Sequence, residues 1–160
     1  MTNSSQHFHG LLQQQRDTAF ELSRTLVQEH EAISGNKLQE LETILAAKQE
    51  LMARFEIASQ EFLSLIQGQS SGEKANIVAV LRQHDPQGTS GLVSLWRQVE
   101  KLLTQCRHSN SVNGKIINLN QRHIQQALSI LRNGEPGTES CYSPTGSRPS
   151  VNASRTLGKV

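Results

Sequence analysis

Hydrophobic residues recur at alternating three- and four-residue steps along the first part of the chain, which is the spacing of a helix that buries one face. A Ser-Gly-Asn sequence at residues 34–36 ends the pattern, and Gly35 suits the left-handed conformation found at many helix ends. We therefore expect a helix over residues 6–34. Gln15 and Glu29 are polar residues on its stripe. The apolar or small residues of the stripe are Phe8, Leu11, Leu12, Thr18, Ala19, Leu22, Leu26, Ala32 and Ile33.

The same spacing restarts directly after this turn. Asn36 is a suitable N-cap and Glu40 suits the first turn of a helix, so we expect a second helix over residues 37–67. Lys48 is the charged residue on its stripe. Because so short a turn joins two long helices, the pair is predicted to form an antiparallel hairpin. The second stripe consists of Leu38, Leu41, Leu45, Met52, Phe55, Ala58, Phe62, Leu65 and Ile66.

The pattern breaks within residues 68–91. A Gly- and Ser-rich loop comes first, and a short apolar segment then predicts a helix over residues 74–84, ended by the proline that follows. A third long helix is expected over residues 90–132, with Ser90 or Thr89 as its cap. Its stripe consists of Leu92, Leu95, Trp96, Val99, Leu102, Leu103, Cys106, Ile116, Ile117, Ile124, Leu128 and Leu131.

The middle of this third stripe carries asparagine where leucine would be expected. Asn110, Asn113 and Asn120 lie on the stripe or beside it. Gly114 lies inside the predicted helix, at a cost of about 1 kcal/mol relative to alanine. A buried asparagine fixes the register of a helix at some cost in stability, whereas an interrupted apolar stripe can also bind the helix of a partner. The pattern alone favours neither interpretation.

Residues 134–160 are rich in Gly, Pro, Ser and Thr and poor in apolar residues, which predicts a flexible tail. The fold class is therefore all-α. Residues 1–133 are expected to form a coiled-coil-like, three-helix bundle, made of the antiparallel hairpin, the third long helix and the short connecting helix. A hydrophobic content of 35% with 4% aromatic residues suffices for long helices that share a narrow seam.

Charge is distributed unevenly along the chain. Residues 1–67 hold five basic and nine acidic residues, whereas residues 92–134 hold six basic and one acidic residue, within a net charge of +2. This balance predicts charge pairing between the third helix and the hairpin. A nucleic-acid-binding protein would instead gather positive charge on an open face, so no nucleic-acid partner is expected.

Signals for catalysis are weak. The sequence at residues 68–74 departs from phosphate-loop spacing, and the histidines form no Glu-x-x-His pair of the kind that binds metals in helical bundles. Cys106 lies on an apolar stripe, where burial would raise the pKa of its thiol. We therefore predict no catalytic residue, no metal site, no cofactor and no enzyme. No secretory signal and no apolar run of ~20 residues is present, which predicts a cytoplasmic protein without membrane insertion.

Three segments share features with one known family. Trp96 precedes an Asn-x-x-Asn-Gly motif at residues 110–114, which two isoleucines follow. A Leu-x-x-Leu motif at residue 38 precedes a Lys-Gln-Glu-Leu sequence that begins at Lys48, and the tail contains Tyr-x-x-x-Gly from Tyr142 onward. In this order and over nearly the whole chain, these segments resemble the FlgN family of flagellar export chaperones.

The resemblance implies a cytosolic chaperone of the flagellar type III export system. Such a chaperone binds the C-terminal helical segments of the hook–filament junction proteins FlgK and FlgL, prevents their premature assembly and delivers them to the export gate, FlhA. Gate docking corresponds here to Tyr142. The substrate-binding residues implied by the resemblance are Asn113, Ile117, Asn120, Ile124, Leu128 and Leu131.

The alternative function is a structural or scaffold coiled-coil protein that self-associates through the same apolar stripes. Light scattering distinguishes the two, because stable oligomers that ignore the junction-protein segments would favour the scaffold.

Overall fold

The structure, a computed structural model, describes residues 2–68 and 76–133. Its helices are α1 (Thr2–Ser34), α2 (Leu38–Gly68), α3 (Ile77–His84) and α4 (Leu92–Asn133), and no strand occurs among the described residues. The all-α fold is confirmed, and the helix ranges agree closely with those predicted. α1 begins at Thr2, earlier than the predicted residue 6. The residues ahead of Phe8 are polar and show no apolar period, so the pattern did not predict this turn, although these residues are compatible with a helix.

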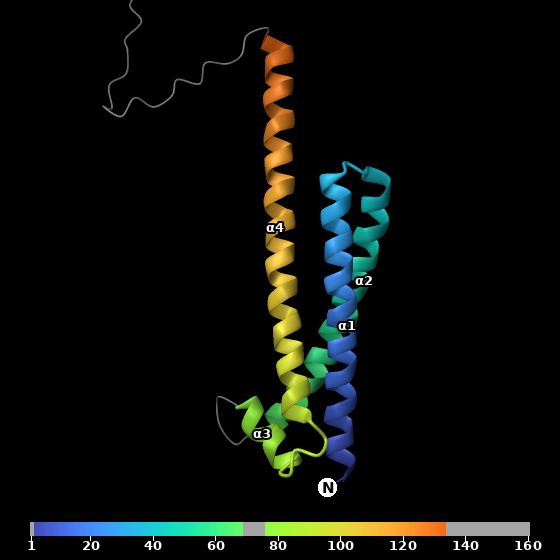
Figure 1. Cartoon of the computed structure of the whole chain (residues 1–160), viewed down its shortest axis with the longest axis vertical. Coiled ribbons are helices and arrows are strands. Elements are labelled where there is room, and N and C mark those ends of the chain that lie inside the picture. Colours follow the sequence, from blue (N-terminus) through green and yellow to red (C-terminus); the bar gives the residue numbers. More distant parts are fainter. Residues whose placement is uncertain (1, 69–75, 134–160) are drawn as a thin grey trace, which may run out of the picture. The chain divides into compact units, whose positions relative to one another are not determined.

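By their internal contacts, residues 1–120 form one unit and residues 121–160 a second. In the first unit, α1, α2 and the first part of α4 lie side by side, and α3 packs where α4 begins (Figure 1). The last turns of α4 belong to the second unit. α4 is helical without a break at Gly114, where an added Cβ would meet no atom within 4 Å. The predicted division at residue 133 stays a prediction, since residues 134–160 lie outside the described part.

The turn between α1 and α2 closes with a left-handed residue. Asn36 has a φ of 55°, its backbone N–H donates to the carbonyl of Ile33 at 3.3 Å, and the N–H of Lys37 donates to that of Ala32 at 2.9 Å. These two bonds form a Schellman motif. The prediction that Gly35 would be the left-handed residue, with Asn36 as the N-cap of the next helix, is wrong. Gly35 keeps a helical bond to the carbonyl of the residue four positions earlier, and Asn36 tolerates the left-handed region.

All four helices contribute to one hydrophobic core. The rings of Phe8 on α1 and Phe62 on α2 meet edge to face with their centroids 5.9 Å apart, and Trp96 on α4 stacks on Phe62 at 5.3 Å. Such aromatic pairs add to the stabilisation that burial gives. The buried residues of this core are Phe8, Leu11, Leu12, Phe62, Ile66, Val80, Leu81, Leu92 and Leu95.

Asp85 joins the end of α3 to the start of α4. Its buried carboxylate accepts hydrogen bonds from the backbone N–H groups of Ser90, Gly91 and Leu92, and from the Thr89 hydroxyl at 3.4 Å. Burial alone would raise the pKa of Asp85, but these hydrogen bonds outweigh it and hold the pKa below its ordinary value. Asp85 therefore caps α4 from the connector.

The prediction that Ser90 or Thr89 would cap α4 is wrong. Gly91 occupies the capping position, with a φ of 63° and a carbonyl that accepts the N–H of Leu95 at 2.9 Å. The Ser90 hydroxyl instead lies 3.3 Å from that of Ser5 on α1. Since glycine has no side chain to satisfy the first N–H groups of the helix, a carboxylate from outside the helix does so.

Replacing Asp85 with asparagine is expected to destabilise the fold in a pH-dependent way. The folded pKa of Asp85 is lower than that of an unfolded aspartate, about 3.9. Its carboxylate therefore contributes stability above that pH, and the contribution is lost as the pH falls through the folded pKa. Urea unfolding of Asp85→Asn and wild type should differ most near neutral pH and converge in acid. A difference that stays constant with pH would contradict this. Asp17→Asn, on the exposed face of α1, serves as the control.

Candidate partner-binding surface

The first half of α4 is anchored in the bundle. Leu92, Leu95, Val99 and Cys106 are buried along one face of the helix. The Cys106 thiol lies 3.5 Å from the carbonyl oxygen of Ala19 on α1, to which it donates. Burial raises the pKa of this thiol, as expected from its place on an apolar stripe. This half of α4 is therefore core rather than a surface for partners.

A layer of polar side chains lies farther along the bundle. Lys48 on α2 donates to both carboxylate oxygens of Glu29 on α1, at 2.9 and 3.0 Å, and to the side-chain oxygen of Asn110 on α4 at 2.7 Å. The Glu29 side chain is 2% exposed and that of Lys48 16%. The charged residues that interrupt the first two stripes in the sequence therefore face each other and connect three helices.

Asn113 completes this polar layer. Its amide nitrogen donates to the carbonyl of Leu26 and to the Glu29 carboxylate, both at 2.9 Å, and its amide oxygen lies 3.1 Å from the ring of His30. Asn113 is 2% exposed, and no buried side-chain nitrogen or oxygen lacks a partner among the described residues. Because a shift of α4 along α1 would separate the Asn113 amide from these partners, the structure favours the register interpretation for Asn113.

The cross-bundle charge pairing expected from the sequence does not appear in the described part of the chain. Its ion pairs lie within or between α1, α2 and the turn that joins them, as in Lys48–Glu29 and Arg54–Glu21. The basic residues of α4 lie on exposed positions, and the face that α4 turns to the hairpin is apolar or carries amides. The prediction is therefore wrong, because summed charge gives no information about which helix face carries it.

Beyond the polar layer, the side chains of α4 become exposed. Ile117 is half-buried, and every residue from 118 to 132 is exposed. Ile124, Leu128 and Leu131 are 60%, 52% and 81% exposed. We call these three residues and Ile117 the distal stripe, because three-, four- and seven-residue steps place them on one side of the helix. Large apolar side chains this open to water are typical of an interaction site.

Of the predicted substrate-binding residues, the distal stripe and Asn120 lie on this exposed segment, whereas Asn113 lies inside the bundle. Tyr142 lies outside the described residues. Two exposed residues were missed: Leu119 and Ile130, 52% and 47% exposed, lie on another face, roughly a third of a turn away. Their spacing to Ile116 repeats the helical step, so the sequence did contain this second apolar face.

The sequence model of one family, described as FlgN protein, matches residues 1–150. The chain belongs to the FlgN family. FlgN proteins are chaperones of flagellar export, not enzymes, and they bind hook-associated proteins. Neither the curated proteins nor the solved structures contain a significant match to the chain.

Within residues 2–68 and 76–133, no group of three or more His, Cys, Asp or Glu side chains is placed to hold a metal ion. No helix in the same part is long and apolar enough to cross a membrane. What this FlgN protein presents instead is an exposed apolar stripe on a helix whose first half is locked into a bundle.

Proposed function

We propose that this chain is the export chaperone of FlgK and FlgL, and that it binds their C-terminal helical segments on the distal stripe of α4. Membership of the FlgN family supports the class of partner. We place the binding site here because Ile124, Leu128 and Leu131, which follow the polar layer along α4, are exposed. Apolar stripes on monomeric junction proteins would aggregate, and covering them removes apolar surface from water at ~25 cal/mol per Å².

In the proposed mechanism, the polar layer anchors α4 in the bundle and the distal stripe binds the partner. Glu29, Lys48 and Asn113 anchor the first part of α4 in the bundle. A partner helix with an apolar stripe then packs along the distal stripe as a helix packs in a groove. In the cytoplasm, this complex keeps FlgK and FlgL from assembling before export. The chaperone role requires no chemistry beyond this reversible burial.

Co-purification tests the proposed partners directly. The full chain is mixed with the C-terminal helical segments of FlgK and FlgL, and separately with an unrelated amphipathic helix of the same length as a control. We expect stoichiometric capture of the junction-protein segments and none of the control helix. Equal capture of the control, or stable oligomers of the chain that ignore both segments, would support the scaffold function instead.

Delivery is proposed to use Tyr142, which docks the complex on the export gate, FlhA. Replacing Tyr142 with alanine is expected to abolish binding to the cytoplasmic part of FlhA and leave the capture of FlgK and FlgL unchanged, since Tyr142 lies outside the distal stripe in the sequence. Pull-down with each partner measures both. A Tyr142→Phe variant shows whether the ring or the hydroxyl carries the contact. Unchanged gate binding of Tyr142→Ala would exclude this role.

A further inference from the structure

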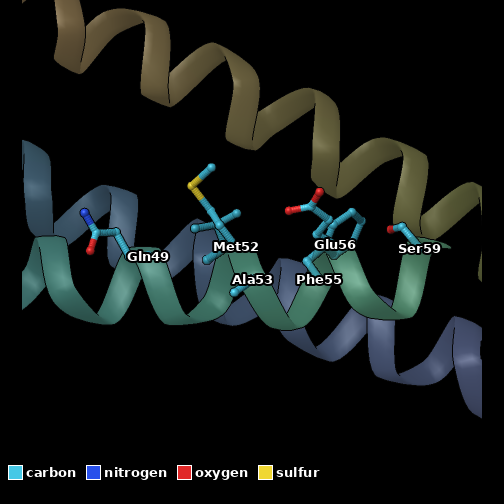
Figure 2. Close-up of a pocket in the computed structure, with 7 residues that line it drawn as sticks. Gln49, Met52, Ala53, Phe55, Glu56 and Ser59 are labelled. Carbon is cyan, nitrogen blue, oxygen red and sulfur yellow. The ribbon is translucent and has the colours of Figure 1, made fainter. Parts of the chain in front are cut away.

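Open grooves follow α1 where it borders α2 and where it borders α4. The first groove, of about 570 Å³, is lined by Leu22 of α1 and by residues of α2 from Gln49 to Ser59. Figure 2 shows Met52, Phe55 and Glu56 projecting from one side of α2 beside this groove. Glu56 is the charged residue of its lining, so this groove repels an acidic segment.

The second groove, of about 410 Å³, lies between α1 and α4 and carries the opposite charge. Phe20, which is 55% exposed, and the half-buried Leu102 form the apolar part of its lining. The Arg16 guanidinium donates to the Asp17 carboxylate at 2.9 and 2.6 Å, so these two charges offset each other. Lys101 also lines the groove and forms no ion pair with any described residue. The groove therefore combines an apolar surface with the positive charge of Lys101.

The apolar surface between α1 and α4 continues along the bundle. The hydrogen bonds of Cys106 and Asn113 to α1 both join residues 87 positions apart, so the two helices run parallel in one register over this stretch. Val27 follows Phe20 after two turns, on the same side of α1, and is 52% exposed. In this register Val27 lies about level with the half-buried Ile116 of α4. A second apolar pair thus extends the surface beyond the first.

A row of basic side chains follows the α4 edge of this surface. Lys101, His108 and Lys115 are seven residues apart, so they lie on one side of the helix, and all three are exposed. Because Lys101 lines the groove, the row marks its α4 edge over about 21 Å. Residues 101–133 contain no acidic residue. The two lysines therefore present positive charge that this part of α4 does not neutralise.

We propose that this surface binds an acidic amphipathic helix of a partner protein. The apolar stripe of the partner helix packs on the floor between α1 and α4, and its carboxylates lie along the lysines at the edge. We call the surface the basic groove. It consists of Phe20, Val27, Leu102 and Ile116 on its floor and Lys101, His108 and Lys115 on its edge.

Spacing and charge select this occupant. The floor residues of both helices recur after two turns or a multiple of them, which is the period of a helix that packs beside two others in a bundle. A flat anionic bilayer would contact Lys101 and Lys115 but would leave Leu102 and Ile116 uncovered. A basic helix would meet like charge at the edge, whereas an acidic one gains charge-assisted contacts there.

The basic groove goes beyond the proposed function and does not depend on it. It shares no residue with the distal stripe, so the chain can hold a substrate segment and the acidic helix of a second protein at once. The test of the groove therefore uses the chain without FlgK or FlgL. Failure of the groove leaves substrate binding to its own experiment.

Fluorescence anisotropy with a labelled synthetic helix measures the binding. The probe has about 18 residues, enough to span the basic row, with leucines at three- and four-residue steps and glutamates beside them. We expect the full chain to bind this probe at least about tenfold more tightly than the same helix with lysine in place of each glutamate. Equal Kd values for the two helices would overturn the proposal.

Variants of the chain locate the probe. Phe20→Glu on the floor and Lys101→Glu on the edge should each raise the Kd by about tenfold or more, because each places a carboxylate against the acidic helix. The controls carry the same new charge outside the groove. Ile57→Glu on α2, where Ile57 is 64% exposed, and Arg107→Glu on another face of α4 should change the Kd by less than about threefold.

Competition and vesicle binding exclude other occupants. A saturating FlgK segment should leave the Kd of the probe unchanged, and displacement of the probe would overturn the proposal because the groove would then belong to the substrate site. Vesicles of phosphatidylglycerol should not displace the probe. A chain that binds these vesicles through Lys101 and ignores the probe would assign the basic row to a membrane surface and overturn the proposal. Circular dichroism of each variant confirms that the helices are retained.

Discussion

Replacing Lys48 with alanine is expected to lower the free energy of unfolding by about 3–5 kcal/mol. The change removes the cation that contacts both oxygens of Glu29, whose side chain is 2% exposed, and leaves that carboxylate buried with only the amide of Asn113 beside it. Asn110 loses its partner in the same step. Urea unfolding followed by circular dichroism measures the loss.

Two further variants establish the cause of the loss. Arg54→Ala removes a pair with Glu21 whose side chains are both more than half exposed and 3.9 Å apart, and it should cost less than about 1 kcal/mol. Combining Lys48→Met with Glu29→Leu replaces the buried charges by apolar groups and should recover most of the stability lost in Lys48→Ala. If Lys48→Ala unfolds at the same urea concentration as Arg54→Ala, the polar layer does not secure α4.

Replacing Leu128 with glutamate is expected to raise the Kd for the FlgK and FlgL segments by about a hundredfold, close to 3 kcal/mol. The substitution places a charge within the distal stripe, where a bound helix would exclude water from it. Leu128 is 52% exposed in the free chain, so the fold itself should be unaffected. Isothermal titration calorimetry gives the Kd.

Ser129→Glu is the matched control for that variant. It adds the same charge one residue along α4, on the polar face, and should change the Kd by less than about threefold. Ile130→Glu reports on the second apolar face of the same segment. A loss of affinity in Ile130→Glu with none in Leu128→Glu would show that the substrate binds the second face. Equal binding by all three variants would show that the substrate does not bind this segment of α4.

The sequence predicted the helices well because their apolar periods are long and regular. It also marked Glu29, Lys48 and Asn113 as polar residues on three apolar stripes, and the structure brings the three together. A polar residue on a buried stripe needs a partner, and another such residue is the natural one. The sequence did not decide whether Asn113 fixes the register of α4 or binds a partner. The contacts of its amide group in the structure favour the register role.

Other features had no signal in the sequence. The capping of α4 by Asp85 depends on how the connector folds back, and residue spacing does not encode this. The exposure of Leu38 and Met52 was also beyond prediction, since a stripe shows which face of a helix is apolar but not whether the chain supplies enough helices to cover it. The predicted pairing of the basic residues of α4 with the hairpin was wrong, because a count of charges does not show which face of a helix carries them.

Hydrogen exchange of the chain with and without a bound FlgK segment tests whether the substrate binds the end of α4, because it locates the bound helix without any substitution. We expect binding to slow exchange of the backbone amides of residues 117–132, where every side chain from 118 onward is exposed in the free chain. Amides around the buried Asn113 should change little, because the polar layer already protects them. Slower exchange confined to α1 and α2, with residues 117–132 unchanged, would show that the substrate does not bind the end of α4.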